Sequence, residues 1–200
     1  MTKYSPEERA EHRQTLVDAA WRCVARTGYC DMTVDHVCQE AGVTKGAFYW
    51  YFRSRDDVLL ALLEEEAMAT ERALLGVIRS TPPGIHRLRR FAKVMLQDGE
   101  DQARMQVRAD LFAEMLCERE VRLRYLAHMR RRHDLLLAAI QEGLVTGEYH
   151  EAVPARAITS ILLALADGLM FHAAVDPPSL RWSILRRGVD VLLAGLGNAS

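Results

Sequence analysis

The 200-residue chain has few of the residues that crosslink a fold or bind metals. Its four cysteines include no C-x-x-C pair, and their spacing matches no standard zinc or disulfide scaffold. We therefore predict no metal site and no cofactor, a reducing cytoplasmic location, and cysteines that are buried as small apolar side chains. Cys23, Cys30 and Cys38 crowd the first forty residues, so a redox role for them stays open.

Motifs of common enzymes are also missing. The chain contains no nucleophile elbow, no phosphate-binding loop and no H-E-x-x-H zinc motif. His128 and His133 are five residues apart, which is wrong for two ligands on one helical face, and no E-x-x-H pair of the di-iron bundle type occurs. These absences argue against an enzyme.

A long hydrophobic run occurs at one place only. The chain starts with the charged segment MTKYSPEERAEHRQ, which has no apolar core of a signal peptide. Residues 157–175 have the length of a membrane span but include Asp167 and His172. Because an unpaired aspartate is costly in the middle of a bilayer, we expect a buried helix of a soluble protein and no membrane partner.

The chain has no excess of positive charge. Its 26 Lys and Arg residues against 27 Asp and Glu residues give a formal net charge of −1, whereas nucleic-acid binders usually carry a basic excess. The balance is uneven, however, because residues 41–55 contain no acid but include Lys45, Arg53 and Arg55. A short basic edge on a near-neutral chain indicates selective rather than indiscriminate binding to DNA.

The residues that are present predict an all-α protein. Apolar residues recur at helical spacing over long stretches, and no run suggests a strand longer than a few residues. We expect an N-terminal three-helix domain at residues 1–54 and a C-terminal helical bundle at residues 55–200, about nine helices in all. After a long fourth helix that starts near Arg55, the expected helices span about 85–98, 102–117, 119–146, 154–175 and 179–195.

Helix-end signals support this division. Ser5 is expected to cap the first helix and Gly28 to end it, while Thr33 and Thr44 are expected to cap two short helices. Gly42 lies between those two helices, where a left-handed backbone makes a tight turn. Two short helices joined in this way are the sequence form of a helix-turn-helix.

Five consecutive aromatic residues, Phe48 to Phe52, occupy the second of these helices. We expect Phe48 and Val37 to face the core of the motif. Since a helix buries only about half its circumference, some of the aromatic residues must be exposed beside Lys45 and Arg53. Exposed aromatic and basic side chains suit contacts with DNA phosphates and base edges.

Residues 33–55 resemble the N-terminal signature of the TetR (tetracycline repressor-like) family of transcriptional regulators. The chain has the family's residues at Thr33, Ala41-Gly42-Val43-Thr44, Gly46-Ala47-Phe48-Tyr49, Tyr51-Phe52, Ser54 and Arg55. It departs at Val37-Cys38, where Ile-Ala is usual, and at Arg55, where Lys is common. The resemblance covers about the first quarter of the chain.

This resemblance implies a DNA-binding surface on double-stranded DNA. It implies phosphate contacts for Thr33, Tyr49 and Arg55. The positions that meet base edges in the family are occupied here by Thr44, Lys45, Gly46 and Ala47, and those that variably touch bases or backbone by Trp50 and Tyr51. Lys45 is the only long donor at the tip of this helix, so it is our candidate for reading a guanine edge.

In the family, the C-terminal region is a bundle that binds a ligand and dimerises. Small residues recur every four positions from Ser160 to His172, which would let another helix approach closely. We expect a homodimer interface formed by Ser160, Ile161, Ala164, Leu165, Gly168, Leu169, Trp182, Leu185, Val189 and Leu192. A purely internal core is the alternative.

The middle helices are rich in flexible apolar side chains, which suit an adaptable pocket as well as an ordinary core. The candidate lining residues are Met68, Phe91, Met95, Met105, Phe112, Met115, Tyr125, Met129 and His172. Asp110, Glu114, Asp167 and His172 are the possible charged groups for a ligand. Residues 130–133, Arg-Arg-Arg-His, span nearly a full helical turn and are expected to be solvated surface.

Together these features predict a ligand-responsive transcriptional regulator. The leading hypothesis is a repressor that binds a palindromic operator as a homodimer and is released by a small, largely apolar effector. A helix-turn-helix protein that activates transcription, or that organises DNA without sequence preference, is the alternative.

Overall fold

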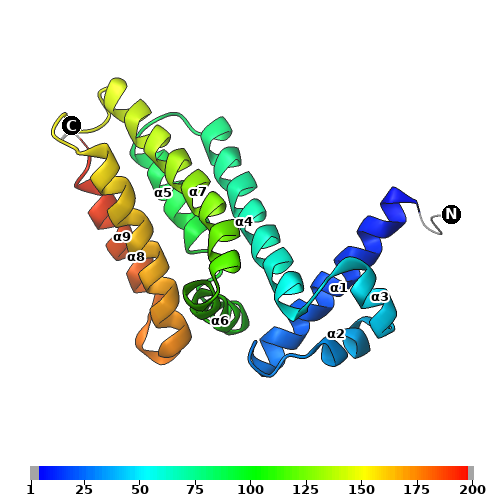
Figure 1. Cartoon of the computed structure of the whole chain (residues 1–200). Coiled ribbons are helices and arrows are strands. Elements are labelled where there is room, and N and C mark those ends of the chain that lie inside the picture. The colour runs from blue at the N-terminus through cyan, green and yellow to red at the C-terminus, as the bar shows by residue number, and fades with distance from the viewer. Residues whose placement is uncertain (1–4, 198–200) are drawn as a thin grey trace. The chain divides into compact units, whose positions relative to one another are not determined.

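The computed structural model describes residues 5–197, and over that range the chain is almost entirely α-helical (Figure 1). The helices are α1 (Pro6–Thr27), α2 (Val34–Ala41), α3 (Lys45–Tyr51), α4 (Arg55–Ser80), α5 (Ile85–Met95), α6 (Gln102–Cys117), α7 (Arg119–Val145), α8 (Ala155–Val175) and α9 (Trp182–Ala194), with a 3₁₀ turn at Pro177–Ser179. The predicted all-α fold class is confirmed.

The helix ends follow the sequence signals. The Ser5 hydroxyl accepts from the Glu8 backbone N–H and the Glu8 carboxylate accepts from that of Ser5, which forms a capping box before α1. Gly28 follows the end of α1 with a φ of 78°. Two helices are shorter than expected: α5 ends at Met95 and α9 begins at Trp182, because turns follow the first and Pro177–Ser179 precedes the second.

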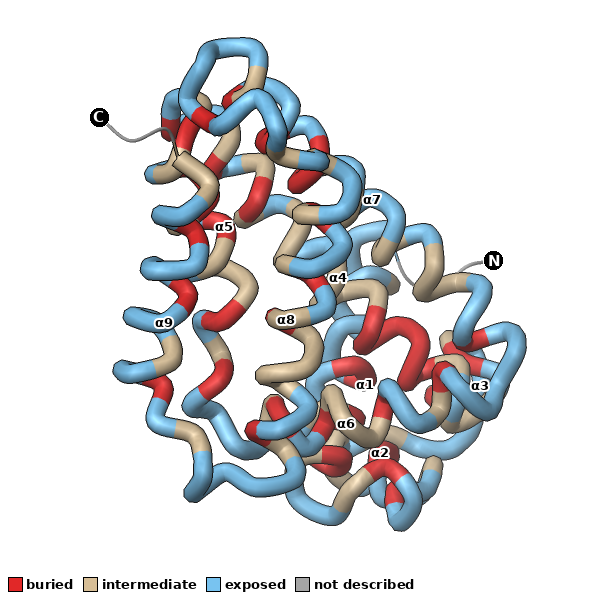
Figure 2. The backbone as a smooth tube through the Cα atoms, turned by 90° about the vertical axis from the view of Figure 1, so that its left-hand side faces the viewer, coloured by how far each residue is buried: buried red, intermediate tan, exposed pale blue. Residues whose placement is uncertain are grey.

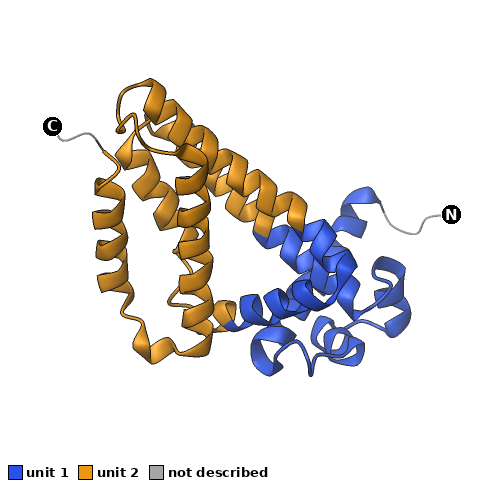
Figure 3. Cartoon of the chain, turned by 60° about the vertical axis from the view of Figure 1, so that its left-hand side comes forward, with its two compact units in different colours: residues 1–66, 106–125 blue, residues 67–105, 126–200 orange. Residues whose placement is uncertain are grey.

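The chain forms two compact units (Figure 3). Unit 1 comprises residues 1–66 and 106–125, and unit 2 comprises residues 67–105 and 126–200. Helices α4, α6 and α7 each contribute residues to both units. The predicted domain boundary between residues 54 and 55 falls directly before α4 and stays a prediction.

Unit 1 packs the helix-turn-helix against α1 and the first half of α4. Its core contains Val37 and Phe48, both fully buried as predicted, together with Leu16 and Leu59. Helix α6 belongs to this unit through Asp110, whose carboxylate accepts from the Tyr29 backbone N–H at 2.8 Å. Asp110 therefore serves as a hydrogen-bond partner within unit 1, and contact with a ligand stays a prediction.

Unit 2 contains a second core, formed mainly by α5, α7, α8 and α9. Buried and exposed stretches alternate along α8 and α9 (Figure 2). By length and composition alone α8 could cross a membrane, and 22% of its most apolar stretch is buried. The expectation of a buried helix therefore holds only in part for the protomer, since Ile161, Phe171 and Val175 of α8 are exposed.

Two expectations about single residue types need correction. Cys23 and Cys38 are buried, but Cys30 and Cys117 are exposed free thiols, because they lie in the loop after α1 and at the end of α6. Arg132 does not belong to a solvated arginine run. Its side chain is only 18% exposed, since this position of α7 faces α8.

Candidate functional site

The helix-turn-helix owes its geometry to a few local residues. Thr33 caps α2 by accepting from the His36 N–H at 3.2 Å, and Thr44 caps α3 by accepting from the Ala47 N–H at 3.2 Å. Between them Gly42 has φ 67° and ψ 32°, the left-handed conformation that favours glycine. These three residues fix the angle at which α3 leaves α2.

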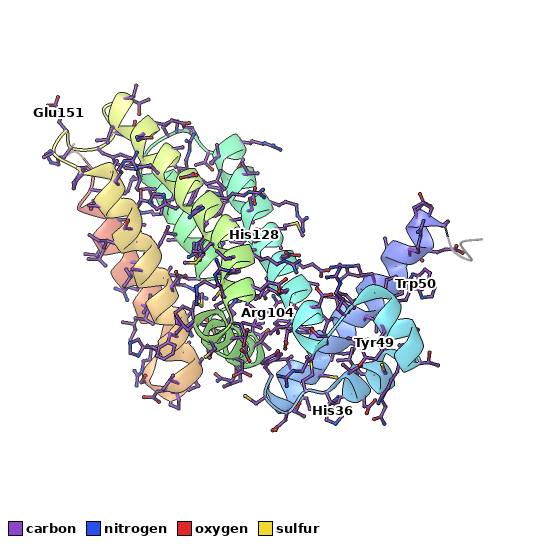
Figure 4. The ribbon with its side chains drawn as sticks, in the orientation of Figure 1. His36, Tyr49, Trp50, Arg104, His128 and Glu151 are labelled. Atoms are coloured by element: carbon purple, nitrogen blue, oxygen red, sulfur yellow. The ribbon has the colours of Figure 1, made fainter. Side chains whose placement is uncertain are left out.

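The aromatic run divides between core and surface. Phe48 and Phe52 are buried, and their rings lie 5.7 Å apart, whereas Tyr49 is 56% and Trp50 70% exposed. Figure 4 labels Tyr49 and Trp50 on α3. The prediction that part of the run must be exposed is confirmed, and the two exposed rings add hydrogen-bonding and stacking groups to the outer edge of α3.

The other predicted contact residues fall on the same segment. Thr33, Thr44, Lys45 and Gly46 are exposed. Ala47 and Tyr51 are partly buried. The structure therefore brings the sequence-predicted residues of α3 to one exposed end of unit 1. Their contacts with DNA stay a prediction.

Lys45 has a partner that sequence reasoning missed. Its Nζ lies 2.7 Å from Asp35 Oδ1 of α2, and both side chains are more than half exposed. The hydrogen bond from Lys45 to this carboxylate raises the pKa of Lys45, so its ammonium group stays protonated at neutral pH. The sequence offers a signal for this partner, since Asp35 lies in the first turn of α2, the helix that comes before the Gly42 turn.

Arg55 is tied to the loop between α1 and α2. Its Nη1 donates to the carbonyl oxygens of Tyr29, Cys30 and Met32 at 3.2–3.4 Å, and its guanidinium lies 4.3 Å from the centroid of the Tyr29 ring. This arginine therefore orders unit 1 in addition to its predicted role at a phosphate. Arg53, by contrast, is exposed beside α3 and is a further candidate for a phosphate contact.

An apolar cavity lies inside unit 2, between α5, α7, α8 and α9. It contains about 500 Å³ of space between atoms, part of it continuous with solvent. Two of the predicted ligand residues, Phe91 and Met95, line it. The other seven do not line this cavity, and their contact with a ligand stays a prediction: they are Met68, Met105, Phe112, Met115, Tyr125, Met129 and His172.

The positions of several of these seven residues have a physical reason. Met115 and Tyr125 pack in or against the core of unit 1, and Met105 is fully buried in the core of unit 2. His172 and Phe112 are exposed. Apolar residues at helical spacing show only that a face is covered, and the sequence does not say whether a cavity or a core covers it.

Arg132 is the one charged residue among those lining the cavity. Its Nη1 and Nη2 donate to Asp167 Oδ1 and Oδ2 of α8 at 2.9 and 2.7 Å. Asp167 was one of the charges predicted for a ligand, and it stands next to the cavity through this ion pair. The sequence could not single out Arg132, because it is one of three consecutive arginines.

The predicted dimer residues separate into two groups. Ser160, Ile161, Ala164 and Leu192 are exposed, and Gly168 and Leu185 are partly exposed. Leu165, Leu169 and Val189 line the cavity. Trp182 and Val189 are buried in the protomer, and their place in the dimer interface stays a prediction.

Exposed apolar residues that the prediction did not include extend the first group. On α8 these are Phe171 and Val175, and on α9 they are Ile184 and Val191. All four are at least half exposed in the protomer. Together with Ile161 and Leu192 they are the large exposed apolar residues of α8 and α9, and we call these six residues the α8–α9 face.

A helix-turn-helix with an exposed basic and aromatic helix, followed by a helical unit with an apolar cavity, defines a DNA-binding regulator of the ligand-responsive class. Comparison with known proteins agrees with this class. Residues 16–62 match the model of the bacterial regulatory proteins of the tetR family, and residues 84–196 match that of the C-terminal region of BetI-type transcriptional repressors. The chain belongs to the TetR family of transcriptional regulators.

Individual relatives are distant. The HTH-type transcriptional regulator SrpR of Pseudomonas putida is 24% identical over 202 residues, covering 89% of this chain and 92% of SrpR. The fold is similar to that of FadR from Bacillus subtilis in complex with stearoyl-CoA, with a TM-score of 0.79, 20% identity and coverage of 92% and 98% of the two chains. A putative regulator from Saccharomonospora viridis in complex with choline has a TM-score of 0.85, 19% identity and coverage of 95% and 100%.

Proposed function

We propose that the protein is a cytoplasmic repressor that binds a palindromic DNA operator as a homodimer and is released when a small, largely apolar effector occupies the cavity of unit 2. The observation that carries the proposal is the outer edge of α3, a helix without acidic residues, where Lys45 lies beside the exposed Tyr49 and Trp50. A near-neutral chain with this one basic edge must gain its affinity from specific contacts made at two half-sites.

The α8–α9 face supports the homodimer. Six large apolar side chains, each at least half exposed, are costly to leave in water and are typical of an interface between subunits. A twofold-symmetric dimer would present two α3 helices to half-sites about 34 Å apart, one turn of DNA. Symmetry in the protein would then match symmetry in the operator.

The cavity supports an effector. Its lining residues come from four helices and are apolar except for Arg132. Relatives of this fold have been solved with stearoyl-CoA and with choline, ligands of different charge, so their chemistry does not transfer to this chain. The effector's chemistry has to follow from the cavity of this protein.

The proposal is tested by selecting DNA bound by the full-length protein from a random pool and footprinting the selected sequence. We expect protection of an inverted repeat by a complex of two protomers, and loss of protection when a cavity ligand is added. Protection that lacks twofold symmetry would contradict the dimer, and a ligand that fills the cavity but strengthens protection would indicate an activator or a corepressed system.

A further inference from the structure

The wall of the cavity in unit 2 contains a single charged side chain, Arg132, among apolar residues. Arg132 extends from α7 between apolar side chains such as Phe91, Leu136 and Leu165. Its side chain is 18% exposed, so water solvates little of the guanidinium. A cation in such a place needs an acceptor, because an unpaired buried charge is strongly destabilising.

The ion pair that supplies this acceptor is asymmetric. Asp167, which occupies Nη1 and Nη2 of Arg132, is 43% exposed, more than twice the exposed fraction of the arginine. The Nε of Arg132 is buried and has no hydrogen-bond partner among the described residues. Asp167 can therefore leave for water at small cost, whereas Arg132 must keep a partner and still has an unused donor.

We propose that the cavity binds an amphiphile with one carboxylate and an apolar tail, and that this carboxylate replaces Asp167 on Arg132. The inference rests on the cavity being the effector site of the proposed function. A ligand carboxylate reproduces the planar, two-oxygen geometry of the group that it displaces, which a guanidinium binds through two parallel hydrogen bonds. The tail fills the apolar space between α5, α8 and α9.

Ligands of other charge fit this wall less well. A neutral molecule leaves the pair between Arg132 and Asp167 intact and gains only apolar burial. A cationic head would have to stand beside the guanidinium, which repels it, or reach past it to Asp167. The exchange also removes the two hydrogen bonds that tie α7 to α8, so binding of a carboxylate changes the contacts between two helices of unit 2.

The test uses three probes, each built on a chain of ten carbons: decanoate (its carboxyl carbon included), 1-decanol and decyltrimethylammonium. They are titrated into the full-length protein by isothermal titration calorimetry below micellar concentrations. We expect decanoate to bind at least about tenfold more tightly than decanol, and the ammonium most weakly. Arg132→Gln should remove the advantage of decanoate and leave decanol binding in place. Arg130→Gln is the matched control, since Arg130 is exposed on the same helix and does not line the cavity.

Asp167→Asn tests the exchange without removing the buried cation, so it serves even where Arg132→Gln fails to fold. Because a competing carboxylate is removed, we expect decanoate affinity to rise severalfold and decanol affinity to stay the same. Any one of four results would overturn the proposal: equal binding of decanoate and decanol, tightest binding of the ammonium, weaker decanoate binding by Asp167→Asn, or no binding of any probe. The calorimetry contains no DNA, so it tests ligand binding alone. Decanoate that binds as expected but leaves operator affinity unchanged in a separate DNA titration would contradict the proposed repression and not the proposed ligand.

Discussion

Gly46 is a residue whose small size serves no purpose inside the protein. A Cβ at this position would lie 3.8 Å from Thr44 Oγ1, an ordinary contact, and would meet no other neighbour within 4 Å. Its φ is not in the left-handed region. Glycine lowers helix stability relative to alanine, so its presence on the exposed tip of α3 is best explained by close approach of DNA.

We therefore expect Gly46→Ala to leave the free energy of unfolding unchanged or to raise it by up to about 1 kcal/mol, and to weaken operator binding at least about tenfold. Thermal unfolding and fluorescence anisotropy with labelled operator measure the two effects. Gly76→Ala in α4 is the matched control, because a Cβ at Gly76 would meet no neighbour within 4 Å. Equal operator affinity for both variants would remove Gly46 from the interface.

The ion pair between Lys45 and Asp35 predicts two opposite effects on DNA binding. Lys45→Ala should lower affinity for the operator while leaving random DNA nearly unaffected, because a base contact is lost. Asp35→Asn should raise affinity for random DNA, because it removes a negative charge from the phosphate-facing edge and releases Lys45.

Electrophoretic titration of operator and random duplexes at two salt concentrations measures both variants. Asp134→Asn, an exposed acid of unit 2, makes the same change in net charge and should affect neither duplex. If Lys45→Ala weakens both duplexes equally, Lys45 contacts phosphate and does not read a base.

The four thiols are predicted to differ in reactivity. Burial raises the pKa of Cys23 and of Cys38, so their thiolate fraction at pH 8 is low and reagents reach them poorly. Cys30 and Cys117 are exposed. Native protein treated with a water-soluble disulfide reagent should therefore release two equivalents of the reagent's thiol rapidly and two more only after denaturation. Mass spectrometry should locate the two rapidly modified cysteines at Cys30 and Cys117.

At the scale of elements, the sequence predicts the helix-turn-helix well because its signals are local. Thr33, Gly42 and Thr44 act within a few residues of themselves, so their capping and turn roles can be read without the rest of the chain. The faces of α8 and α9 could not be predicted in this way. Both helices are apolar on several sides, and only packing separates Leu165, which lines the cavity, from Ile161, which is exposed.

Gly99 shows the same limit. In sequence it marks a joint between two helices, but its Cβ would lie 2.3 Å from the Trp182 ring. The contact joins residues far apart in the chain, and it holds Trp182 inside the protomer and away from the α8–α9 face. Long-range contacts of this kind decide which of two apolar sides of a helix is internal, and spacing alone does not contain them.

The α8–α9 face predicts the effect of a substitution at Gly168. A Cβ there has no neighbour within 4 Å in the protomer, so Gly168→Leu can be accommodated without internal strain. At an interface between two α8 helices the added side chain would hold them apart. We expect sedimentation velocity to show monomers for this variant and dimers for the wild type.

Gly76→Leu in α4 is the control for the added apolar surface, since Gly76 is equally free of neighbours in the protomer and lies outside the predicted interface. It should sediment as the wild type does. Dimers that persist in Gly168→Leu would show that the subunits meet elsewhere.

At the scale of the whole molecule, charge and ligand response work together. The net charge of −1 supplies little general attraction to DNA, so in the proposed dimer the free energy of operator binding has to come from the contacts of two correctly spaced α3 helices. A repressor of this kind is sensitive to small changes in spacing. An effector needs to alter the affinity by only about 1–3 kcal/mol to empty the operator.

Thermodynamic linkage makes this coupling measurable from either side. If an effector that fills both cavities of the proposed dimer lowers operator affinity by a given factor, the operator must lower the product of the two effector binding constants by the same factor, which for about 1–3 kcal/mol is roughly 5- to 150-fold. Calorimetric titration of the effector into free protein and into the operator complex gives one factor, and operator titration with and without saturating effector gives the other. We expect the two factors to agree for wild type, and to approach one together in a variant whose cavity no longer binds the effector. Two factors that differ would mean that effector molecules also bind outside the two cavities, since linkage between these two cavities and one operator permits a single value.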